Sequence, residues 1–236
     1  MKGIVLAGGK GTRLFPLTTV VSKQLLPVYD KPMIYYPLGT LKQMGIKDVL
    51  IITKPEDRAL FEKQLGDGSQ FGMNFTFYIQ RHPRGLPEAF IIGEDFIEDD
   101  SVTLILGDNV FVGPLNYVPG KRNCVFGYKV TNPEQYGVFD FNNHRIVEKP
   151  KEYVSDWACV GLYIFNNTCV EKAKTLKPSA RDELEIADLI NSFDNIDYAK
   201  LKDNVAWFDC GTFDDLNECS NYIRALKRRT NIEVGL

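Results

Sequence analysis

A glycine-rich segment near the amino terminus combines residue types that suit a phosphate-binding loop. Gly8, Gly9 and Gly11 follow a short apolar run, and Arg13 comes two residues after the last of them. Glycine lets the backbone approach a ligand closely, and successive backbone N–H groups can bind the oxygens of an anion. A guanidinium nearby adds a charged donor for phosphate. The segment predicts an anion site, and the alternative is a simple glycine turn that ends a strand.

Two common phosphate-binding motifs do not fit this segment. A dinucleotide fingerprint needs a third small residue, but Leu14 stands at that place in G-K-G-T-R-L. A Walker A loop needs a glycine where Ile4 stands, and a Ser or Thr where Gly11 follows the lysine. A dehydrogenase would also need an acidic residue after its second strand, where the chain has Thr53 and Lys54.

Two aspartates stand at the ends of apolar runs. Asp108 follows SVTLILG, and Asp209 ends AWFD. Ligands of open α/β sheets bind at the carboxyl ends of strands, and Mg²⁺ prefers a few carboxylates completed by phosphates and water. Either residue alone is equally well explained as a turn-forming or helix-capping aspartate. Together they suggest a metal site built from distant segments.

The elements that would position these residues alternate along the first half of the chain. Apolar runs separated by helical spacing are typical of a parallel sheet covered on both faces. We expect strands in KGIVLA, DVLIIT, MNFTFYIQ and SVTLILG, and helices over 32–44, 55–65 and 86–97. Later strands are expected in CVFGYKV, YGVFDF, RIVEKP, ACVGLYIF and AWFD, and helices over 182–193 and 212–230. The pattern predicts an α/β fold with a Rossmann-like, doubly wound mixed sheet in a single domain.

Composition limits the function classes. The chain has 236 residues, 44% of them hydrophobic, and a net charge of −3, which gives no overall attraction to nucleic acid or membrane. Its five cysteines are odd in number and dispersed, so we expect reduced thiols. No signal peptide or membrane-spanning run is visible. We therefore expect a cytoplasmic enzyme without nucleic-acid or membrane partners, which can form a homo-oligomer.

Motifs along the whole chain resemble the sugar-nucleotidyltransferase family, and most closely its thymidylyltransferases. They begin with LAGGKGTRLFPLT and VSKQLLPVYDKPMIYYPL, and continue in the family's order through LGDGS, QRHPRGLPEAF, LILGDNVF, PEQYGVFDF, VEKP, GLYIF, LKPSARDELEIADLI and AWFDCGTFDDL. The resemblance implies the nucleotidyltransferase fold. It also implies transfer of a nucleotidyl group from dTTP to glucose 1-phosphate, with Mg²⁺ as cofactor and release of pyrophosphate.

The resemblance also assigns roles to residues. The catalytic set it implies is Arg13, Lys23, Asp108, Lys149 and Asp209, with Asp108 and Asp209 as the metal ligands. The nucleotide-binding residues are Leu6, Gly8, Gly9, Gly11, Thr12, Arg13, Gln80, Pro83, Gly85 and Asp108. The sugar-phosphate-binding residues are Asn109, Tyr136, Gly137, Glu148, Lys149, Cys159 and Tyr163. Residues 1–107 would form a nucleotide-binding half and residues 108–236 a sugar-binding half.

The chain departs from the family pattern at three places. Pro87 and Glu88 replace the usual Ala-Gln before the helix that follows the nucleoside loop, and Cys159-Val160 replaces Val-Thr near the hexose. The helical extension of longer members, which follows the matched region, is not expected. The alternatives are the same reaction with UTP or another hexose 1-phosphate, and a non-catalytic nucleotide-sugar-binding regulatory protein.

Overall fold

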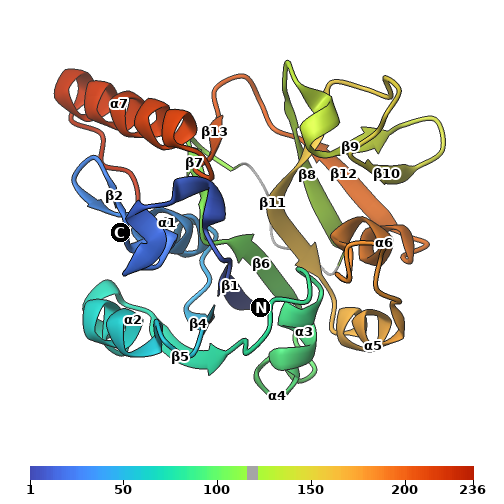
Figure 1. The fold of residues 1–236 in the computed structure, drawn as a ribbon, viewed down its shortest axis with the longest axis horizontal. Coiled ribbons are helices and arrows are strands. Elements are labelled where there is room, and N and C mark those ends of the chain that lie inside the picture. The colour runs from blue at the N-terminus through green and yellow to red at the C-terminus, as the bar shows by residue number, and fades with distance from the viewer. Residues whose placement is uncertain (116–121) are drawn as a thin grey trace. The chain divides into compact units, whose positions relative to one another are not determined.

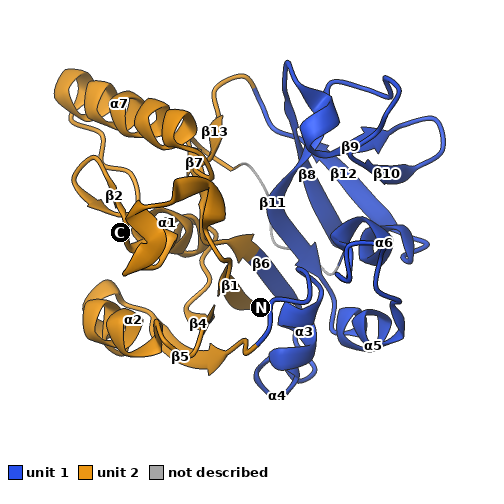
Figure 2. Ribbon diagram, viewed as in Figure 1, with its two compact units in different colours: residues 1, 82–104, 119–202 blue, residues 2–81, 105–118, 203–236 orange. Residues whose placement is uncertain are grey.

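The computed structural model describes residues 1–115 and 122–236, which form two compact units (Figure 2). Unit 1 comprises residue 1 and residues 82–104 and 119–202, and unit 2 comprises residues 2–81, 105–118 and 203–236. The chain enters each unit more than once. Neither unit is therefore a continuous half of the sequence.

Unit 2 contains a parallel sheet of apolar strands. β1 (Lys2–Ala7) pairs with β4 (Asp48–Thr53), which pairs with β5 (Asn74–Ile79), all in parallel. The end of β6 (Val102–Leu106) lies on the other side of β1, where the Gly107 N–H donates to the Leu6 carbonyl at 3.0 Å. Side chains of β4 from Val49 to Ile52 are fully buried, as expected for a strand covered on both faces.

Helices and short strands complete unit 2. α1 (Tyr35–Gln43) follows β3 (Lys31–Pro32), and α2 (Arg58–Leu65) follows β4. α7 (Phe213–Thr230) lies beside β13 (Ala206–Asp209) and β2 (Pro27–Val28) (Figure 1). β7 (Asn109–Val112) pairs antiparallel with β13, and β2 with β3. Single 3₁₀ turns occupy Thr12–Leu14, Leu17–Thr19, Lys23–Leu25 and Ser69–Phe71.

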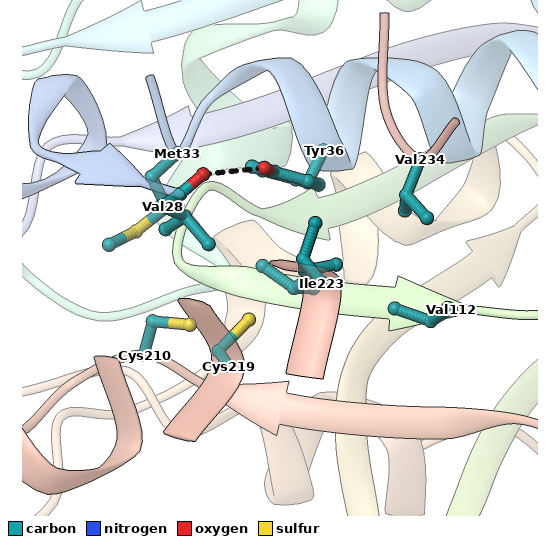
Figure 3. Packing of buried hydrophobic residues seen from close by; sticks show 9 residues of the cluster. Val28, Met33, Tyr36, Val112, Cys210, Cys219, Ile223 and Val234 are labelled. Carbon is teal, nitrogen blue, oxygen red and sulfur yellow. Dashed lines mark hydrogen bonds between the residues drawn. The ribbon is translucent and has the colours of Figure 1, made fainter. Parts of the chain in front are cut away.

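A buried cluster joins α1, α7, β7 and β13 within unit 2 (Figure 3). The Tyr36 hydroxyl donates to the Val28 carbonyl at 2.6 Å, so the polar group of this buried tyrosine has a hydrogen-bond partner. The side chains of Cys210 and Cys219 are in contact in this cluster, and both are fully buried. The chain end belongs to the same unit, because the Leu236 N–H donates to the Tyr35 carbonyl at 3.0 Å. The last residues thereby help to fix α1.

Unit 1 contains a mixed sheet. β8 (Asn123–Lys129) pairs antiparallel with β11 (Trp157–Phe165) and parallel with β12 (Ile196–Lys200). β9 (Gly137–Asp140) pairs antiparallel with both β10 (Arg145–Glu148) and β11, and the first residues of β6 adjoin β11. The helices are α3 (Glu88–Ile92), α4 (Glu94–Ile97), α5 (Thr168–Thr175) and α6 (Ile186–Asn191), with a 3₁₀ turn at Pro133–Gln135.

The expected strands are confirmed, but two of the expected helices differ. The helix expected over 86–97 is interrupted at Gly93, whose backbone leaves the helical region between α3 and α4. The helix expected over 182–193 begins only at Ile186, because Asp182 has a left-handed φ of 58° and Glu185 is extended. α5, β7 and β12 were not predicted from the sequence.

Two further expectations concern membranes and thiols. All five cysteines are free thiols, as expected. Among the described residues, no helix combines the length and apolar character that a membrane span requires.

Candidate active site

The carboxyl edge of the parallel sheet in unit 2 gathers several predicted residues. Gly8 follows β1 and Gln80 follows β5, and both lie at this edge because the strands are parallel. A Cβ atom added to Gly8 would collide with the amide oxygen of Gln80, which is 3% exposed. Glycine at this position therefore leaves room for the Gln80 side chain. Asp108 follows β6 at the same edge.

The two predicted metal ligands are brought together by strand pairing. Asp209 lies opposite Asn109 in the β13–β7 register, so its neighbour across the strands is the residue after Asp108. The Cys210 N–H donates to the Asp108 carbonyl at 2.9 Å, which fixes the two backbones. The Asp108 residue is 8% exposed, and the Asp209 side chain is 25% exposed. Two segments about a hundred residues apart thus place their carboxylates in one site.

The pKa values of this carboxylate pair shift in opposite directions. Burial raises the pKa of Asp209 above its ordinary value, and the negative charge of Asp108 raises it further. Burial would also raise the pKa of Asp108, but the Lys23 ammonium overcomes this effect and holds that pKa below its usual range. The site therefore holds one firmly ionised carboxylate and one that resists ionisation.

Two cations flank the carboxylates. Lys23 forms an ion pair with Asp108, and its side chain is only 13% exposed, so it is not a solvated surface lysine. Arg13 lies 3.9 Å from Asp209 through its Nη2 atom, and its side chain is 60% exposed. The short contact with Asp108 fixes Lys23. The contact between Arg13 and Asp209 is long and exposed, so the Arg13 guanidinium can move to bind a ligand.

The glycine-rich loop runs beside these cations. Gly11 has a left-handed φ of 64°, and its carbonyl accepts a hydrogen bond from the Thr18 hydroxyl at 2.8 Å. A Cβ atom added to Gly9 would lie 3.5 Å from Cε of Lys23, so the loop passes directly along the lysine. Thr12 is exposed and begins the first 3₁₀ turn. Leu6 is buried in β1, where its carbonyl accepts from Gly107.

The oxygen ligands of this site fit a magnesium ion. Within residues 1–115 and 122–236, no three His, Cys, Asp or Glu side chains come together as a metal-binding group. Mg²⁺ binds sites of one or two carboxylates and takes its remaining ligands from phosphates and water. A bound cation would also stabilise the ionised forms of these two neighbouring carboxylates, because it offsets their mutual repulsion. Asp108 and Asp209 meet that description.

In unit 1, four of the predicted sugar-phosphate residues meet at one end of a hairpin. Glu148 of β10 lies opposite Gly137 of β9, and the Lys149 N–H donates to the Tyr136 carbonyl at 3.0 Å. A Cβ atom on Gly137 would come within 2.9 Å of the Glu148 carboxylate, so glycine makes room for it. Lys149 is exposed and has a left-handed φ of 43°. This hairpin end presents a carboxylate and an ammonium together.

The remaining sugar-phosphate predictions are placed differently. Cys159 lies on β11 near Glu148; burial raises the pKa of its thiol, and the Glu148 charge adds to this effect. Tyr163 is 3% exposed and stacks on Phe165, so little of its side chain is available to a ligand. Asn109 belongs to unit 2, where it accepts a hydrogen bond from the Trp207 indole at 2.7 Å.

The predicted nucleoside loop lies in unit 1. Gly85 has a φ of 103° and forms a parallel bridge with Leu184, and Pro83 is partly exposed two residues earlier. Only glycine suits this backbone, because a Cβ atom would strike the backbone of Leu184.

Comparison with known proteins identifies the family. The family model for nucleotidyl transferases matches residues 2–225. The chain belongs to this family. It is 50% identical to a glucose-1-phosphate thymidylyltransferase of Neisseria meningitidis over 100% of this chain and 86% of that protein. It is 46% identical to the enzyme of the same name from Mycolicibacterium smegmatis, again over 100% of this chain and 86% of that protein.

Solved structures of this family share the fold. A structure named for glucose-1-phosphate thymidylyltransferase from Bacillus anthracis superposes with a TM-score of 0.87 and 37% identity, covering 99% of this chain and 97% of that one. A UDP-glucose pyrophosphorylase in complex with UDP-glucose gives a TM-score of 0.81 and 25% identity, covering 97% and 99%. The expected nucleotidyltransferase fold, with its mixed sheet, is therefore confirmed.

In each unit, residues that were not predicted from the sequence contact candidate residues of that unit. In unit 2, Trp207 holds the amide of Asn109, and Gly211 lies against the guanidinium of Arg13. In unit 1, Arg181 lies 3.3 Å from Glu148 through Nη2 and 2.7 Å from Glu185. The motif AWFDCGT contains Trp207 and Gly211, but their contacts depend on the β7–β13 pairing, which the sequence does not specify.

Gly211 offers a direct test of where Arg13 must lie. A Cβ atom at this position would collide with the Arg13 guanidinium, the flexible end of an exposed side chain, so Gly211→Ala is expected to move Arg13 without unfolding the protein. We expect turnover to fall by about tenfold, which corresponds to 1.4 kcal/mol of transition-state stabilisation. Steady-state rates together with the melting temperature check this. An unchanged rate would mean that Arg13 works from another position.

Proposed function

We propose that this chain transfers a thymidylyl group from dTTP to glucose 1-phosphate, releasing pyrophosphate and dTDP-glucose. The observation that carries the proposal is the carboxylate pair Asp108 and Asp209, flanked by Lys23 and Arg13 beside a glycine-rich loop. Relatives that are 42–50% identical are named for this activity, which supports the choice of substrates.

The proposed chemistry is an in-line displacement at the α-phosphorus of the nucleotide. The nucleophile is an oxygen of the sugar phosphate, which is already ionised near neutral pH, so no general base is needed. Positioning and charge stabilisation then supply the catalysis. The N–H groups of the glycine-rich loop would bind the β- and γ-phosphates. Lys23 would face the α-phosphate, and Arg13 would stabilise the charge that grows on the departing pyrophosphate.

Asp108 and Asp209 would hold Mg²⁺. When bound, the ion neutralises phosphate charge and polarises the reacting phosphoryl group. The chain's own contribution is to fix two oxygen ligands on rigid strand ends. Lys23 keeps Asp108 ionised, and is available to phosphate once the carboxylate binds a cation. Binding of the metal would therefore increase the affinity for the nucleotide, and binding of the nucleotide would increase the affinity for the metal.

The residues in unit 1 would bind the second substrate and the base. Lys149 would pair with the phosphate of glucose 1-phosphate, and Glu148 would accept hydrogen bonds from hexose hydroxyls. Tyr136, Gly137, Cys159 and Tyr163 stay predicted hexose neighbours, as does Asn109 in unit 2. Gln80, Pro83 and Gly85 stay predicted neighbours of the base. The five free thiols support a reducing compartment such as the cytoplasm.

Pyrophosphate release, measured across four nucleoside triphosphates and a panel of sugar 1-phosphates, tests the proposal. The expected result is the highest kcat/KM with dTTP and glucose 1-phosphate. UTP is the second candidate nucleotide, because a structural neighbour at 25% identity binds UDP-glucose. A protein that binds nucleotide sugar without releasing pyrophosphate would instead be the regulatory, non-catalytic alternative.

The carboxylate pair also predicts a pH-dependent stability without metal. Asp209 has its pKa raised in the folded state, so the folded protein holds that proton more tightly than the unfolded chain does. The stability associated with this proton is present at low pH and is lost as the pH rises above about 4, the ordinary aspartate pKa. In EDTA at pH 8, Asp209→Asn is therefore expected to melt at least about 3 °C higher than the wild type.

The matched measurements are made at pH 5 and after addition of Mg²⁺. At pH 5 the two proteins should melt at more similar temperatures, because more of the wild-type Asp209 retains its proton. Saturating Mg²⁺ at pH 8 should raise the melting temperature of the wild type and have little effect on Asp209→Asn. If Asp209→Asn melts below the wild type in EDTA at pH 8, the ionised Asp209 carboxylate does not destabilise the folded protein, and the prediction is wrong.

A further inference from the structure

We propose that Glu88 is a positioning residue that holds the nucleoside loop, residues 83–85, in the conformation that receives the base of the nucleotide. This role rests on the proposed function, and its structural basis lies entirely in unit 1. Glu88 is the first residue of α3 and is only 6% exposed. Glutamate is rarely so buried unless its carboxylate is paired.

Both carboxylate oxygens of Glu88 bind the same loop residue. Oε2 accepts a hydrogen bond from the backbone N–H of Arg84 at 3.1 Å. Oε1 accepts from Nε of Arg84 at 2.8 Å and lies 2.7 Å from its Nη2. Charge-assisted bonds of this kind are stronger than neutral ones. The carboxylate therefore fixes the backbone and the side chain of Arg84 at once.

The loop is held from its other side by the segment before α6. The Leu184 N–H donates to the Arg84 carbonyl at 2.8 Å, and Gly85 bridges to Leu184. The backbone of Arg84 is thus held at its N–H by Glu88 of α3 and at its carbonyl by Leu184. Removal of either support frees the loop on that side. Of the two supports, only Glu88 acts through a side chain that can be replaced.

The negative charge of Glu88 is neutralised within the loop. A buried carboxylate beside a site for a polyanion would repel the nucleotide unless it were neutralised. The Arg84 guanidinium supplies that neutralising charge, while its side chain stays 70% exposed. Glu88 therefore shapes the loop without adding a net negative charge to it.

An exposed arginine–glutamate pair elsewhere in the chain serves as a control for the Arg84–Glu88 pair. Arg58 and Glu62 have the same residue types and the same spacing on α2, with Nε 2.7 Å from Oε1. Both side chains are more than 40% exposed, and exposed pairs at this spacing contribute little to stability. Glu62→Ala is thus a matched control for Glu88→Ala.

The consequence is specific to the base. A loop that is no longer fixed has to be ordered when the base binds, which weakens nucleotide binding and leaves phosphate chemistry intact. Glu88→Ala should raise the dissociation constant and KM for dTTP about tenfold, and change kcat by less than about twofold. The KM for glucose 1-phosphate should not change. Glu88→Gln should give a smaller increase of about threefold, because its amide oxygen can still accept from the Arg84 N–H.

The experiment measures binding of Mg-dTTP and of Mg-pyrophosphate to the wild type, Glu88→Ala, Glu88→Gln and Glu62→Ala. Pyrophosphate has no base, so its affinity should be equal in all four proteins. Hydrogen exchange of residues 81–88 should accelerate most in Glu88→Ala, less in Glu88→Gln, and not in Glu62→Ala. Melting temperatures establish that each variant is folded. If Glu88→Ala does not fold, Glu88→Gln still tests the role of Glu88.

An unchanged affinity for dTTP in the Glu88 variants, or an equal loss of affinity for dTTP and pyrophosphate, would overturn the role of Glu88. A wild-type protein that binds dTTP but releases no pyrophosphate with any sugar 1-phosphate overturns the proposed reaction instead. The binding comparison then still decides the role of Glu88. A wild type that binds no nucleotide overturns both.

Discussion

Replacement of Asp209 by asparagine is expected to lower turnover by about a thousandfold while the protein stays folded. Asparagine keeps the shape of the side chain but removes the charge that would hold Mg²⁺, and loss of metal-based charge stabilisation costs several kcal/mol. Asp209 is a cleaner test than Asp108. The Asp108→Asn change would also release Lys23 from its ion pair, so it alters two groups at once.

Asp30→Asn is the matched control for this variant. Asp30 is another aspartate of unit 2, pairs with Lys227 at 2.6 Å, and has a similarly exposed side chain at 24%. Its replacement should leave pyrophosphate release unchanged. Near-normal turnover of Asp209→Asn at ordinary Mg²⁺ concentrations would remove Asp209 from the metal site.

Arg13→Ala is expected to lower kcat by about a hundredfold and to weaken nucleotide binding much less. A guanidinium that meets charge developing on the leaving group contributes mainly in the transition state, where removal of one such group costs about 10²–10³ in rate. The 3.9 Å contact with Asp209 and the 60% exposure of the side chain leave Arg13 free to make this interaction. Single-turnover rates at saturating dTTP isolate the chemical step.

Arg58→Ala provides the comparison for Arg13→Ala, since Arg58 is an exposed arginine of unit 2 that lies on α2. It should retain full activity. If Arg13→Ala changes only the KM for dTTP, Arg13 binds the ground-state phosphates and does not act on the leaving group.

Much of the fold could be predicted because the parallel strands are continuous apolar runs. The failures have local causes. β7 is separated from the end of β6 by only two residues, and β12 mixes polar and apolar residues in IDYAK, so neither stands out as a separate apolar run. The helix expected over 86–97 has helical spacing throughout, and only the backbone at Gly93 divides it.

The candidate site was predictable at the level of residue types, but not of contacts. Asp108 follows an apolar strand and Asp209 ends one, which the sequence indicates. Their proximity depends on the register of β7 against β13, a pairing between segments far apart in the chain. The role of Glu88 was hidden for a similar reason. The sequence indicates an added negative charge near an anion site, but only the structure reveals that Arg84 neutralises it.

The interleaved path of the chain has a consequence for synthesis on the ribosome. The parallel strands β1, β4 and β5 of unit 2 all lie within the first 81 residues and can pair early. Residues 203–236 belong to the same unit and are made after all of unit 1 (Figure 2). They carry Asp209 and α7, and end at the Leu236 contact with α1.

A nascent chain therefore carries Asp108 for about a hundred residues of translation before its partner carboxylate exists, about 5–20 s at ordinary elongation rates. During that interval the surface of α1 and β7 that later packs on α7 has no cover, and exposed apolar surface of this kind is what chaperones bind. Ribosome-bound chains that stop before residue 203 would be held by a chaperone and inactive. Activity would arise only after residues 203–236 have left the exit tunnel.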